Sequence, residues 1–235
     1  MNDKRAELLP NRDQHIAIFA PTGYGKSELA RQMVSNFSDV IVIDNKREWS
    51  WGELAKADPR HYRFQFSDKD KLRRELDRIA RDRTGEPVMY SPPAKLNSAG
   101  QLWAWRDTID DICFYALRRG NTIVLFDELE SCFRSGDWEY NAPAFCALVY
   151  QGRSKRSVGW FLCKRPQRVP FIILTECRKK YVFDLGSREA RARAEDICRH
   201  RIPWEKILEP YRWMYADEYG MLGPFTLKTG ENKWQ

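Results

Sequence analysis

One segment constrains the fold more than any other: the glycine-rich run Ala20–Ser27, with the sequence Ala-Pro-Thr-Gly-Tyr-Gly-Lys-Ser. It follows an apolar run, His15–Ala20, that is typical of a buried strand, and it opens a segment with helical spacing, Lys26–Phe37. A strand, a glycine-rich turn and a helix in this order gather backbone N–H groups and a helix N-terminus around one concavity. The segment therefore predicts a loop that binds phosphate groups.

Each residue type in this loop suits one part of a nucleoside triphosphate. Gly23 and Gly25 let the backbone approach the phosphates, and Lys26 can reach the β and γ phosphates. The hydroxyl of Ser27 is expected to bind Mg²⁺, so ATP and Mg²⁺ are the predicted cofactors. The usual pattern begins with glycine; Ala20 takes that place here, which the loop tolerates if its φ stays negative. The predicted binding set is Pro21, Thr22, Gly23, Tyr24, Gly25, Lys26, Ser27 and Glu28.

A second motif lies further along the chain, where the apolar run Thr122–Phe126 leads directly into Asp127 and Glu128. If this run is a strand of the same parallel sheet, both carboxylates lie at its carboxyl edge, beside the phosphate loop. Asp127 is then expected to hold Mg²⁺, and Glu128 to polarise the attacking water as a general base. Glu130 is a weaker candidate for the base. The two motifs together predict hydrolysis of the triphosphate.

Apolar runs typical of strands alternate with segments of helical periodicity along the chain. The expected strands are His15–Ala20, Val40–Asp44, Tyr62–Phe66, Pro87–Tyr90, Thr122–Phe126, Val158–Cys163, Tyr181–Leu185 and Phe225–Lys228. The expected helices are Lys26–Phe37, Asp68–Arg83, Ala99–Arg119, Ala144–Tyr150 and Ser187–Arg199, with Ser187 as an N-cap. Ser91–Ala99 and Ser131–Pro143 are expected to be loops. This alternation predicts an α/β fold with a mainly parallel central sheet and helices on both faces, in a single domain over residues 1–235.

Charge is distributed unevenly along the chain, whose formal net charge is +7. The segment 151–215 carries 16 Lys and Arg against 7 Asp and Glu. A basic half of this kind is typical of proteins that contact nucleic acid, and it is equally compatible with a solvated surface. Within it, Arg178–Lys180 is interpreted as a solvated turn in preference to a DNA contact.

Composition also bears on location and on the cysteines. No apolar run approaches the roughly 18 residues that cross a bilayer, and no apolar stretch follows the first basic residues. The sequence therefore predicts a protein without a transmembrane segment or secretory signal, working in the cytoplasm of a cell or host cell. Six cysteines are scattered without Cys-x-x-Cys spacing, which favours reduced, mostly buried thiols over a metal site.

Three segments carry a resemblance to a known family. Gln151–Pro166 resembles the HerA/FtsK branch of the P-loop ATPases, in which a Gly-Arg segment leads into a strand ending in Gln-Arg-Pro. Pro21–Ser27 is similar to that branch's Thr-Gly-x-Gly-Lys-Ser, and Asp44–Glu48 is similar to its Asp-Pro-x-x-Glu element. The matches span roughly Ile16 to Leu185, and the chain looks most like the genome-packaging ATPases of icosahedral viruses with an internal membrane. The resemblance implies a RecA-like (ASCE) P-loop NTPase fold.

The resemblance also implies roles for residues beyond the two motifs. In the family, the strand-terminal Gln senses the γ-phosphate; Lys164 holds that position here, and Arg165 and Pro166 match. A cation can contact the γ-phosphate, but it cannot both donate and accept as an amide does. An arginine from a neighbouring subunit is expected to stabilise charge on the transferred phosphoryl group. Arg153 is the first choice for it and Arg156 the second; an ordinary surface role is equally open for each.

The resemblance further implies a motor that packages a viral genome into a preformed capsid. Its expected partners are double-stranded DNA, bound without sequence specificity, a homo-oligomeric ring (pentamer or hexamer), and a capsid or membrane vertex partner. The expected location is the host cytoplasm or the virion vertex. Ser131–Ala142, with Arg134, is the first candidate for a DNA-contacting pore loop; Lys155 and Arg156 are others.

Four alternatives stay open. Two are ATPases: a DNA translocase of the conjugation or chromosome-partition type, and a morphogenesis ATPase of the filamentous-phage type. The third is a small-molecule kinase, which uses the same phosphate loop and a mobile arginine-rich lid, for which Arg178–Arg193 is the matching segment. The fourth is a nucleotide-regulated binding module that does not turn over.

Overall fold

The strands of the described chain form one mixed sheet. The structure is a computed structural model that describes residues 8–46, 49, 65–66, 69–82, 88–91, 99–132 and 141–227. In sheet order the strands are β3 (Gln65–Phe66), β4 (Val88–Tyr90), β2 (Val40–Asp44), β5 (Ile123–Asp127), β6 (Val158–Cys163), β1 (Ile16–Phe19), β7 (Lys179–Phe183), β8 (Arg212–Ala216) and β9 (Met221–Thr226). All pairings from β3 to β7 are parallel, and β7–β8 and β8–β9 are antiparallel. The predicted mainly parallel α/β fold is confirmed.

Helices connect most of these strands. They are α2 (Lys26–Val34), α4 (Lys69–Asp82), α5 (Ala99–Arg119), α6 (Leu129–Cys132), α8 (Pro143–Gln151), α9 (Phe171–Thr175) and α10 (Arg188–Cys198). Short 3₁₀ segments, η1 (Gly152–Lys155), η2 (Pro166–Arg168) and η3 (Trp204–Lys206), join others. Within the described part of the chain, no helix is both long enough and apolar enough to cross a membrane.

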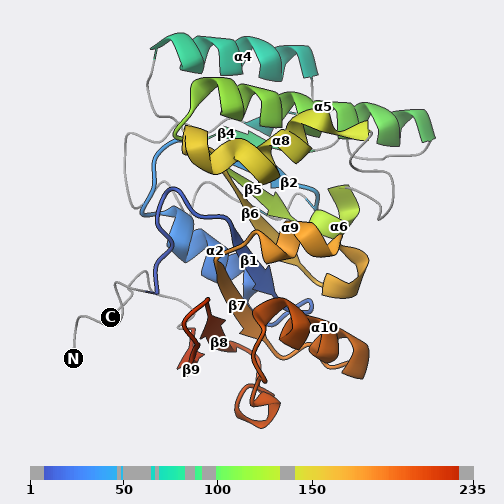
Figure 1. Cartoon of the computed structure of the whole chain (residues 1–235). Helices are drawn as coiled ribbons and strands as arrows, with labels where there is room; N and C mark the ends of the chain where they lie inside the picture. The colour runs from blue at the N-terminus through green and yellow to red at the C-terminus, as the bar shows by residue number, and fades with distance from the viewer. Residues whose placement is uncertain are drawn as a thin grey trace.

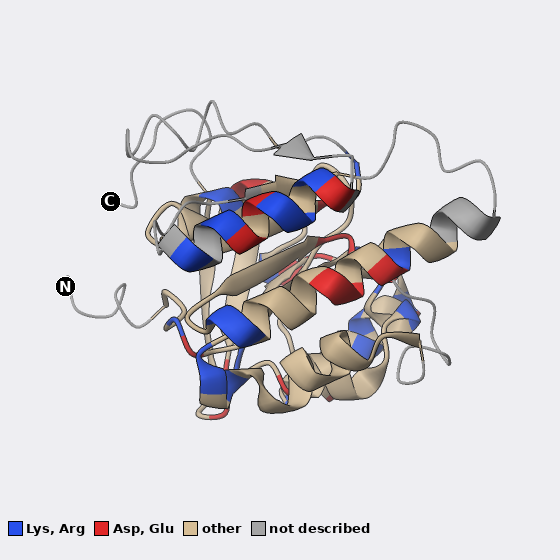
Figure 2. Cartoon of the chain, turned by 90° about the horizontal axis from the view of Figure 1, so that it is seen from above, with Lys and Arg blue, Asp and Glu red and all other residues tan. Residues whose placement is uncertain are grey.

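The strands bury both faces, so their side chains divide between two apolar layers. Ala17 and Phe19 of β1 pack into a layer formed with α5, α8, α9 and α10, whereas Ile16 and Ile18 pack on the other side against α2. Figure 1 shows this arrangement, with α5 and α8 above the upper strands and α2 beside β1. The α4 helix lies outside α5 and presents alternating basic and acidic side chains (Figure 2). Helices therefore cover both faces of the sheet, as predicted.

The register brings the carboxyl ends of the central strands to one edge. Phe19 at the end of β1 is level with Cys163 at the end of β6, and Asp44 of β2 is paired with Asp127 of β5. The backbone N–H of Ala20 extends this pairing by donating to the carbonyl of Cys163 at 3.1 Å. The segments that follow β1, β2, β5 and β6 therefore meet at this edge of the sheet, which is where parallel α/β sheets bind ligands.

Several predicted boundaries are wrong, each for a local reason. The helix predicted to reach Phe37 ends at Val34, because the side chains of Ser35 and Asn36 bond to the carbonyl of Gln32 at 2.7 and 3.0 Å and compete with the helical pattern. The predicted loop Ser131–Pro143 begins with the last turn of α6, whose Cys132 is buried, and ends on the first residue of α8. Residues 133–140 of that loop, including Arg134, lie outside the described residues.

The predicted solvated turn at Arg178–Lys180 is wrong for Lys179 and Lys180, whereas Arg178 precedes the strand and is exposed. Lys179 and Lys180 begin β7, and both are buried. Lys179 Nζ donates to the carbonyl of Leu9 at 2.7 Å, and Lys180 Nζ donates to the carbonyl of Cys177. Long aliphatic stems let these two lysines sit in a strand while their ammonium groups reach backbone carbonyls. They are therefore not a DNA-contacting surface.

The antiparallel edge was only partly predicted. No sequence pattern predicts a strand at β8, and the predicted last strand, Phe225–Lys228, begins inside β9 and ends beyond the described residues. The residues of β8 alternate between the two apolar layers, with Trp213 on one side and Met214 on the other, so the run shows no polar face. Its pairing with β7 and β9 places Arg212 level with Thr226 and just beyond Phe183, at the same sheet edge as the glycine-rich loop.

Candidate nucleotide site

The loop Ala20–Ser27 has the backbone that a phosphate cradle requires. Gly23 and Gly25 take left-handed φ values of 85° and 97°, where a side chain would be strained. Ala20 does not take a positive φ, so the loop tolerates alanine at this position, as predicted. Helix α2 begins at Lys26 with Gly25 as its N-cap, and its first N–H groups have no intrahelical acceptor. The concavity therefore combines free N–H groups with the positive end of a helix.

Gly25 is also contacted by residues from the C-terminal part of the described chain. A Cβ at this position would lie 2.7 Å from Cδ1 of Tyr211 and 2.9 Å from Cδ2 of Leu227. The N–H of Tyr211 donates to the carbonyl of Tyr24 at 3.2 Å. The start of β8 and the residue after β9 therefore pack directly on the glycine-rich loop, a contact that sequence reasoning missed because it joins segments almost two hundred residues apart.

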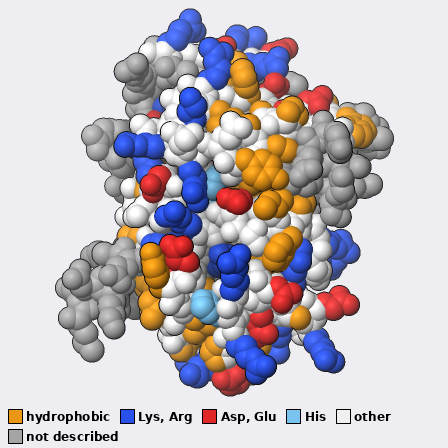
Figure 3. Space-filling view, viewed as in Figure 1, with side chains coloured by type: hydrophobic (Ala, Val, Ile, Leu, Met, Phe, Trp, Pro, Cys, Tyr) orange, Lys and Arg blue, Asp and Glu red, His pale blue; other side chains and the backbone are white. Residues whose placement is uncertain are grey.

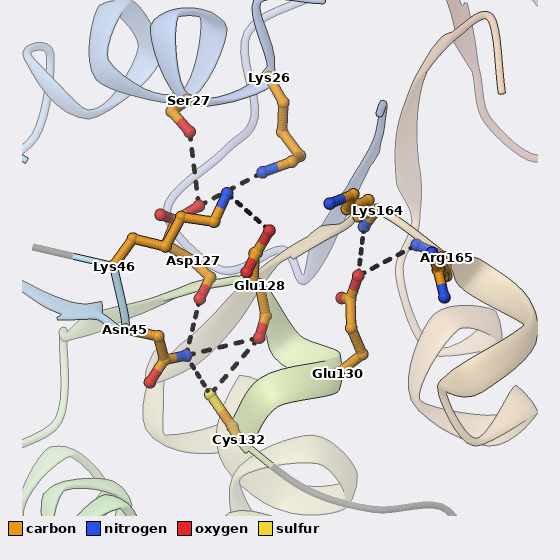
Figure 4. Close-up of polar contacts among 10 residues, drawn as sticks. All are labelled: Lys26, Ser27, Asn45, Lys46, Asp127, Glu128, Glu130, Cys132, Lys164 and Arg165. Carbon is orange, nitrogen blue, oxygen red and sulfur yellow. Dashed lines mark hydrogen bonds and ion pairs between the residues drawn. The ribbon is translucent and has the colours of Figure 1, made fainter. Parts of the chain in front are cut away.

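Lys26 and Ser27 point toward Asp127 at the end of β5 (Figure 4). Lys26 Nζ and Ser27 Oγ each lie 3.4 Å from Asp127 Oδ1. The lysine side chain is 5% exposed and the aspartate is fully buried, so water screens their charges weakly. The structure brings the three residues together as the sequence predicted.

The donors around Asp127 fit a bound Mg²⁺. Its second oxygen, Oδ2, is buried and has no hydrogen-bond partner among the described residues, and an unpartnered buried carboxylate oxygen is costly. The hydroxyl of Ser27 lies beside the same carboxylate. A carboxylate and a hydroxyl, with phosphate oxygens, are the hard oxygen ligands that Mg²⁺ prefers. Ser27 and Asp127 are therefore the residues that would hold the metal.

Glu128 lies next to this carboxylate but in a different environment. Its φ of 57° is left-handed, which is uncommon for a residue with a side chain and turns the chain sharply at the end of β5. Its Oε1 forms an ion pair of 2.6 Å with Nζ of Lys46, and the glutamate side chain is 13% exposed. The carboxylate is thus held by a cation from the segment after β2, close to Asp127 (Figure 4).

Asn45 fixes the backbone that carries both carboxylates. Its Nδ2 donates to the carbonyl of Asp127 at 2.8 Å, and its Oδ1 accepts from Nε1 of Trp105 at 3.0 Å. The same amide lies 3.0 Å from Sγ of Cys132 in α6. The family-like segment after β2 therefore contributes a clamp, Asn45, and a cation, Lys46; its residues Arg47 and Glu48 lie outside the described residues. The signal that could have found the clamp is the one that found Asp127, a polar residue directly after a buried strand.

Glu130, the weaker candidate for the base, contacts the backbone at the end of β6. Its Oε1 accepts the backbone N–H groups of Lys164 at 2.8 Å and Arg165 at 3.1 Å. These contacts join α6 to the end of β6, as Figure 4 shows. Glu130 therefore bridges the two segments, and the choice of Glu128 as the base stays a prediction.

Lys164 follows the last residue of β6, at the sheet edge that carries Lys26 and Asp127. This is the place where the family pattern has its sensor glutamine. Its backbone is fixed by Glu130, and its side chain is half-buried. The position is therefore compatible with a contact to the γ-phosphate, and that role stays a prediction.

Arg153 and Arg156 lie far from this edge. Both are exposed and precede β6, whereas the phosphate loop follows β1, which is parallel to β6. They are therefore at the amino edge of the sheet, opposite the phosphates, and a contact to a phosphoryl group requires another copy of the chain. Gly152 keeps this segment tight, since a Cβ there would lie 2.1 Å from the carbonyl oxygen of Ser157.

The segment that carries these arginines is rigidly attached. Ser157 donates its N–H to the carbonyl of Gly152 at 2.8 Å and its hydroxyl to the carbonyl of Ala116 at 2.7 Å. The carbonyl of Lys155 accepts from the N–H of Asn121 at 3.1 Å. A fixed backbone is what an arginine acting on a neighbouring site needs, because misplacement of such a group weakens its effect.

Burial shifts the pKa values of several groups toward their neutral forms. Burial lowers the pKa of His15 to about 4, and its Nδ1 accepts the N–H of Gly159 at 2.8 Å. Burial raises the pKa of Cys132 and of Cys198 to about 12. The cysteines are all free and mostly buried, as predicted. The raised pKa values make the thiols of Cys132 and Cys198 poor nucleophiles.

The basic half does not form one uniform surface. Arg191 of α10 pairs with Asp184 at 2.7 Å, and Arg193 lies over the ring of Phe171 at 4.5 Å. Figure 3 shows basic side chains spread over this face with acidic ones between them. Part of the excess positive charge of residues 151–215 is therefore engaged in contacts within the chain.

A family model matches the part of the chain that carries the phosphate loop. The model of the family described as "Helicase HerA, central domain" matches residues 7–99, which include the phosphate loop and the β2 segment. The comparison with curated proteins gives no match.

Solved structures share the fold over most of the chain. The genome packaging NTPase B204 from Sulfolobus turreted icosahedral virus 2, in complex with ATP-gammaS, is 12% identical with a TM-score of 0.61, covering 92% of this chain and 99% of that chain. VirB4 of Thermoanaerobacter pseudethanolicus is 10% identical with a TM-score of 0.63, covering 92% of this chain and 89% of that chain. The fold is thus that of a P-loop ATPase.

Proposed function

We propose that the chain is a P-loop ATPase of the HerA/FtsK type and that it is a motor that hydrolyses ATP to move double-stranded DNA. Residues 1–235 act as one ATPase domain in a homo-oligomeric ring. More specifically, it packages a viral genome into a capsid, together with a capsid or membrane vertex partner. It works in the host cytoplasm or at the virion vertex. Support for DNA comes from the solved structures, which include the DNA-packaging ATPase B204.

One observation carries the proposal: the hydrolytic residues and Arg153 lie at opposite edges of the same sheet. Lys26, Asp127 and Glu128 can bind a triphosphate and activate water. None of the three supplies a positive charge from a neighbouring subunit to the phosphoryl oxygens. When identical subunits close into a ring, the leading edge of each meets the following edge of the next. A site divided between subunits in this way suits a motor whose subunits hydrolyse ATP in response to one another.

Hydrolysis follows from the roles of these residues. Backbone N–H groups of 23–28 and Lys26 hold the phosphates, and Ser27 and Asp127 hold Mg²⁺, which neutralises charge on the phosphates when bound. Glu128 accepts a proton from the attacking water once Lys46 releases its carboxylate. Lys164 contacts the γ-phosphate from the end of β6, and Arg153 of a neighbouring subunit, with Arg156 as second choice, stabilises the transferred group.

A second candidate is a conjugation-type DNA translocase, favoured by the structural similarity to VirB4. Such a translocase would hydrolyse ATP in the same way and would also form a ring. It would differ from a packaging motor in that the DNA would not enter a capsid. The preference for packaging rests on the motif resemblance around Gly152–Pro166 and on B204, whose whole length this chain nearly covers.

DNA is expected to stimulate the ATPase. Purified protein should hydrolyse ATP several-fold faster with double-stranded DNA of mixed sequence than without it, and the stimulation should fall as salt rises, since phosphate contacts release counterions. The measurement is steady-state ATP hydrolysis with light scattering for oligomeric state. A rate and an oligomeric state that DNA of every length leaves unchanged would contradict the motor.

Arg153 is expected to act on a neighbouring subunit. Arg153→Ala alone and Glu128→Gln alone should each lose most activity, roughly 10³-fold for an arginine finger. Mixing the two proteins should restore part of it, because some interfaces then pair an intact Glu128 with an intact Arg153. Arg178→Ala, at an exposed arginine outside η1, is the matched control and should keep the parent activity without mixing. Mixtures as inactive as the separate variants would exclude a role in trans.

A further inference from the structure

Tyr211, directly before β8, contacts the phosphate loop and is partly exposed. The ring of this tyrosine packs on Gly25, so close that a Cβ on the glycine would lie 2.7 Å from it. Even so, 36% of the residue is exposed. An aromatic ring that touches the loop with one part and faces solvent with another is available to a ligand seated in the loop.

The backbone of Tyr211 is strained and locked. Its φ of 65° is left-handed, which is a rare conformation for a bulky residue. Its N–H donates to Tyr24, and its carbonyl accepts the N–H of Leu227 at 2.8 Å. Strain of this kind persists only where surrounding contacts over-determine it, and it concentrates at ligand-binding positions.

The sheet order tells which part of the nucleotide lies near this ring. From the loop after β1, Asp127 and Glu128 lie two strands away on the β6–β5 side, and Tyr211 precedes β8, two strands away on the β7 side. Figure 1 shows β7, β8 and β9 on the side of β1 away from β5. Because Lys26 and Ser27 point toward Asp127, the γ-phosphate and the metal lie on the β5 side. The nucleoside therefore leaves the loop on the side of Tyr211.

We propose that Tyr211 forms the wall on which the base of the bound nucleotide stacks. The inference rests on the proposed function in that it takes the loop as a nucleotide site, and it adds the residue that contacts the base. Stacking needs only the face of a ring, so it fits any nucleobase and favours nucleoside triphosphates over inorganic polyphosphate.

The test measures binding to the full-length protein with Mg²⁺, using ATP and inorganic tripolyphosphate as probes. Tyr211→Leu keeps apolar packing on Gly25 and removes the aromatic face; Tyr211→Phe keeps the ring. We expect Tyr211→Leu to weaken ATP binding roughly tenfold and to leave tripolyphosphate binding unchanged, whereas Tyr211→Phe should match the parent protein.

The outcomes separate the alternatives. Equal weakening for both probes would mean that Tyr211 only supports the phosphate loop, and unchanged ATP binding would mean that it does not contact the base; either overturns the inference. If Tyr211→Leu does not fold, photolabelling of the parent protein with 8-azido-ATP decides: label on the peptide containing Tyr211 supports the stacking, and label confined to other peptides overturns it. A parent protein that binds neither probe would refute the proposed function itself.

Discussion

Replacing Glu128 with glutamine is expected to lower ATP hydrolysis roughly 10²–10⁴-fold, the usual contribution of a general base, while ATP binding persists. Glutamine has nearly the same volume and can still accept a hydrogen bond, but it cannot take a proton from water. The left-handed backbone of Glu128 and the clamp of Asn45 on the preceding carbonyl are unaffected by the change. Binding and turnover should therefore separate cleanly.

The substitution also removes the charge that Lys46 contacts at 2.6 Å. That pair is partly exposed, so its loss should have little effect on the melting temperature. The measurements are ATP hydrolysis and equilibrium ATP binding, with the exposed Glu189→Gln of α10 as the matched control. Hydrolysis of the variant at the parent rate would point to another base. A parent protein that binds ATP without hydrolysing it would point to a binding module, and phosphorylation of a small acceptor without DNA would point to a kinase.

Replacing Asp127 with asparagine is expected to reverse the effect of Mg²⁺ on ATP binding. The fully buried carboxylate lies 3.4 Å from Lys26 Nζ and repels phosphate when no metal is present. Without Mg²⁺ the variant should therefore bind ATP more tightly than the parent protein. With Mg²⁺ it should bind less tightly, and hydrolysis should fall roughly 100-fold or more, since a metal supplies several kcal/mol of charge stabilisation.

The measurement is ATP affinity in the presence of Mg²⁺ and in the presence of a chelator, together with the hydrolysis rate. Asp196→Asn, at an exposed position of α10, is the control for the loss of one negative charge. If Asp127→Asn retained the parent's dependence on Mg²⁺ in both binding and hydrolysis, the assignment of the metal to Ser27 and Asp127 would be wrong.

Much of the parallel half of the fold could be predicted from local patterns. β2 and β6 have the predicted bounds, and α5 has the predicted ends, because a fully buried strand is a continuous apolar run and a long helix has clear periodicity. The N-cap at Ser187 is likewise local: its Oγ accepts the N–H of Ala190 at 3.2 Å. The antiparallel edge was harder, since β8 is defined by its pairing with β7 and β9 and not by its own pattern.

The site divides in the same way. Lys26, Ser27, Asp127 and Glu128 follow motifs whose residues are close in sequence, so their meeting required only that β1 and β5 share one sheet. The contacts of Glu130 with the N–H groups of Lys164 and Arg165, and of Asn45 with Asp127, depend on separate segments converging at one edge. No short pattern encodes such contacts.

The loop at Ala20–Ser27 shows both contributions. The sequence by itself determined that a strand, two glycines and a helix would build a phosphate cradle, because the glycine φ values and the helix N-terminus are local properties of the backbone. Only the tertiary structure decided what surrounds that cradle: Asp127 on one side, Tyr211 on the other, and Arg153 at the opposite edge of the sheet. Strand order and register fix these positions, and they are set by burial of both sheet faces across the whole chain.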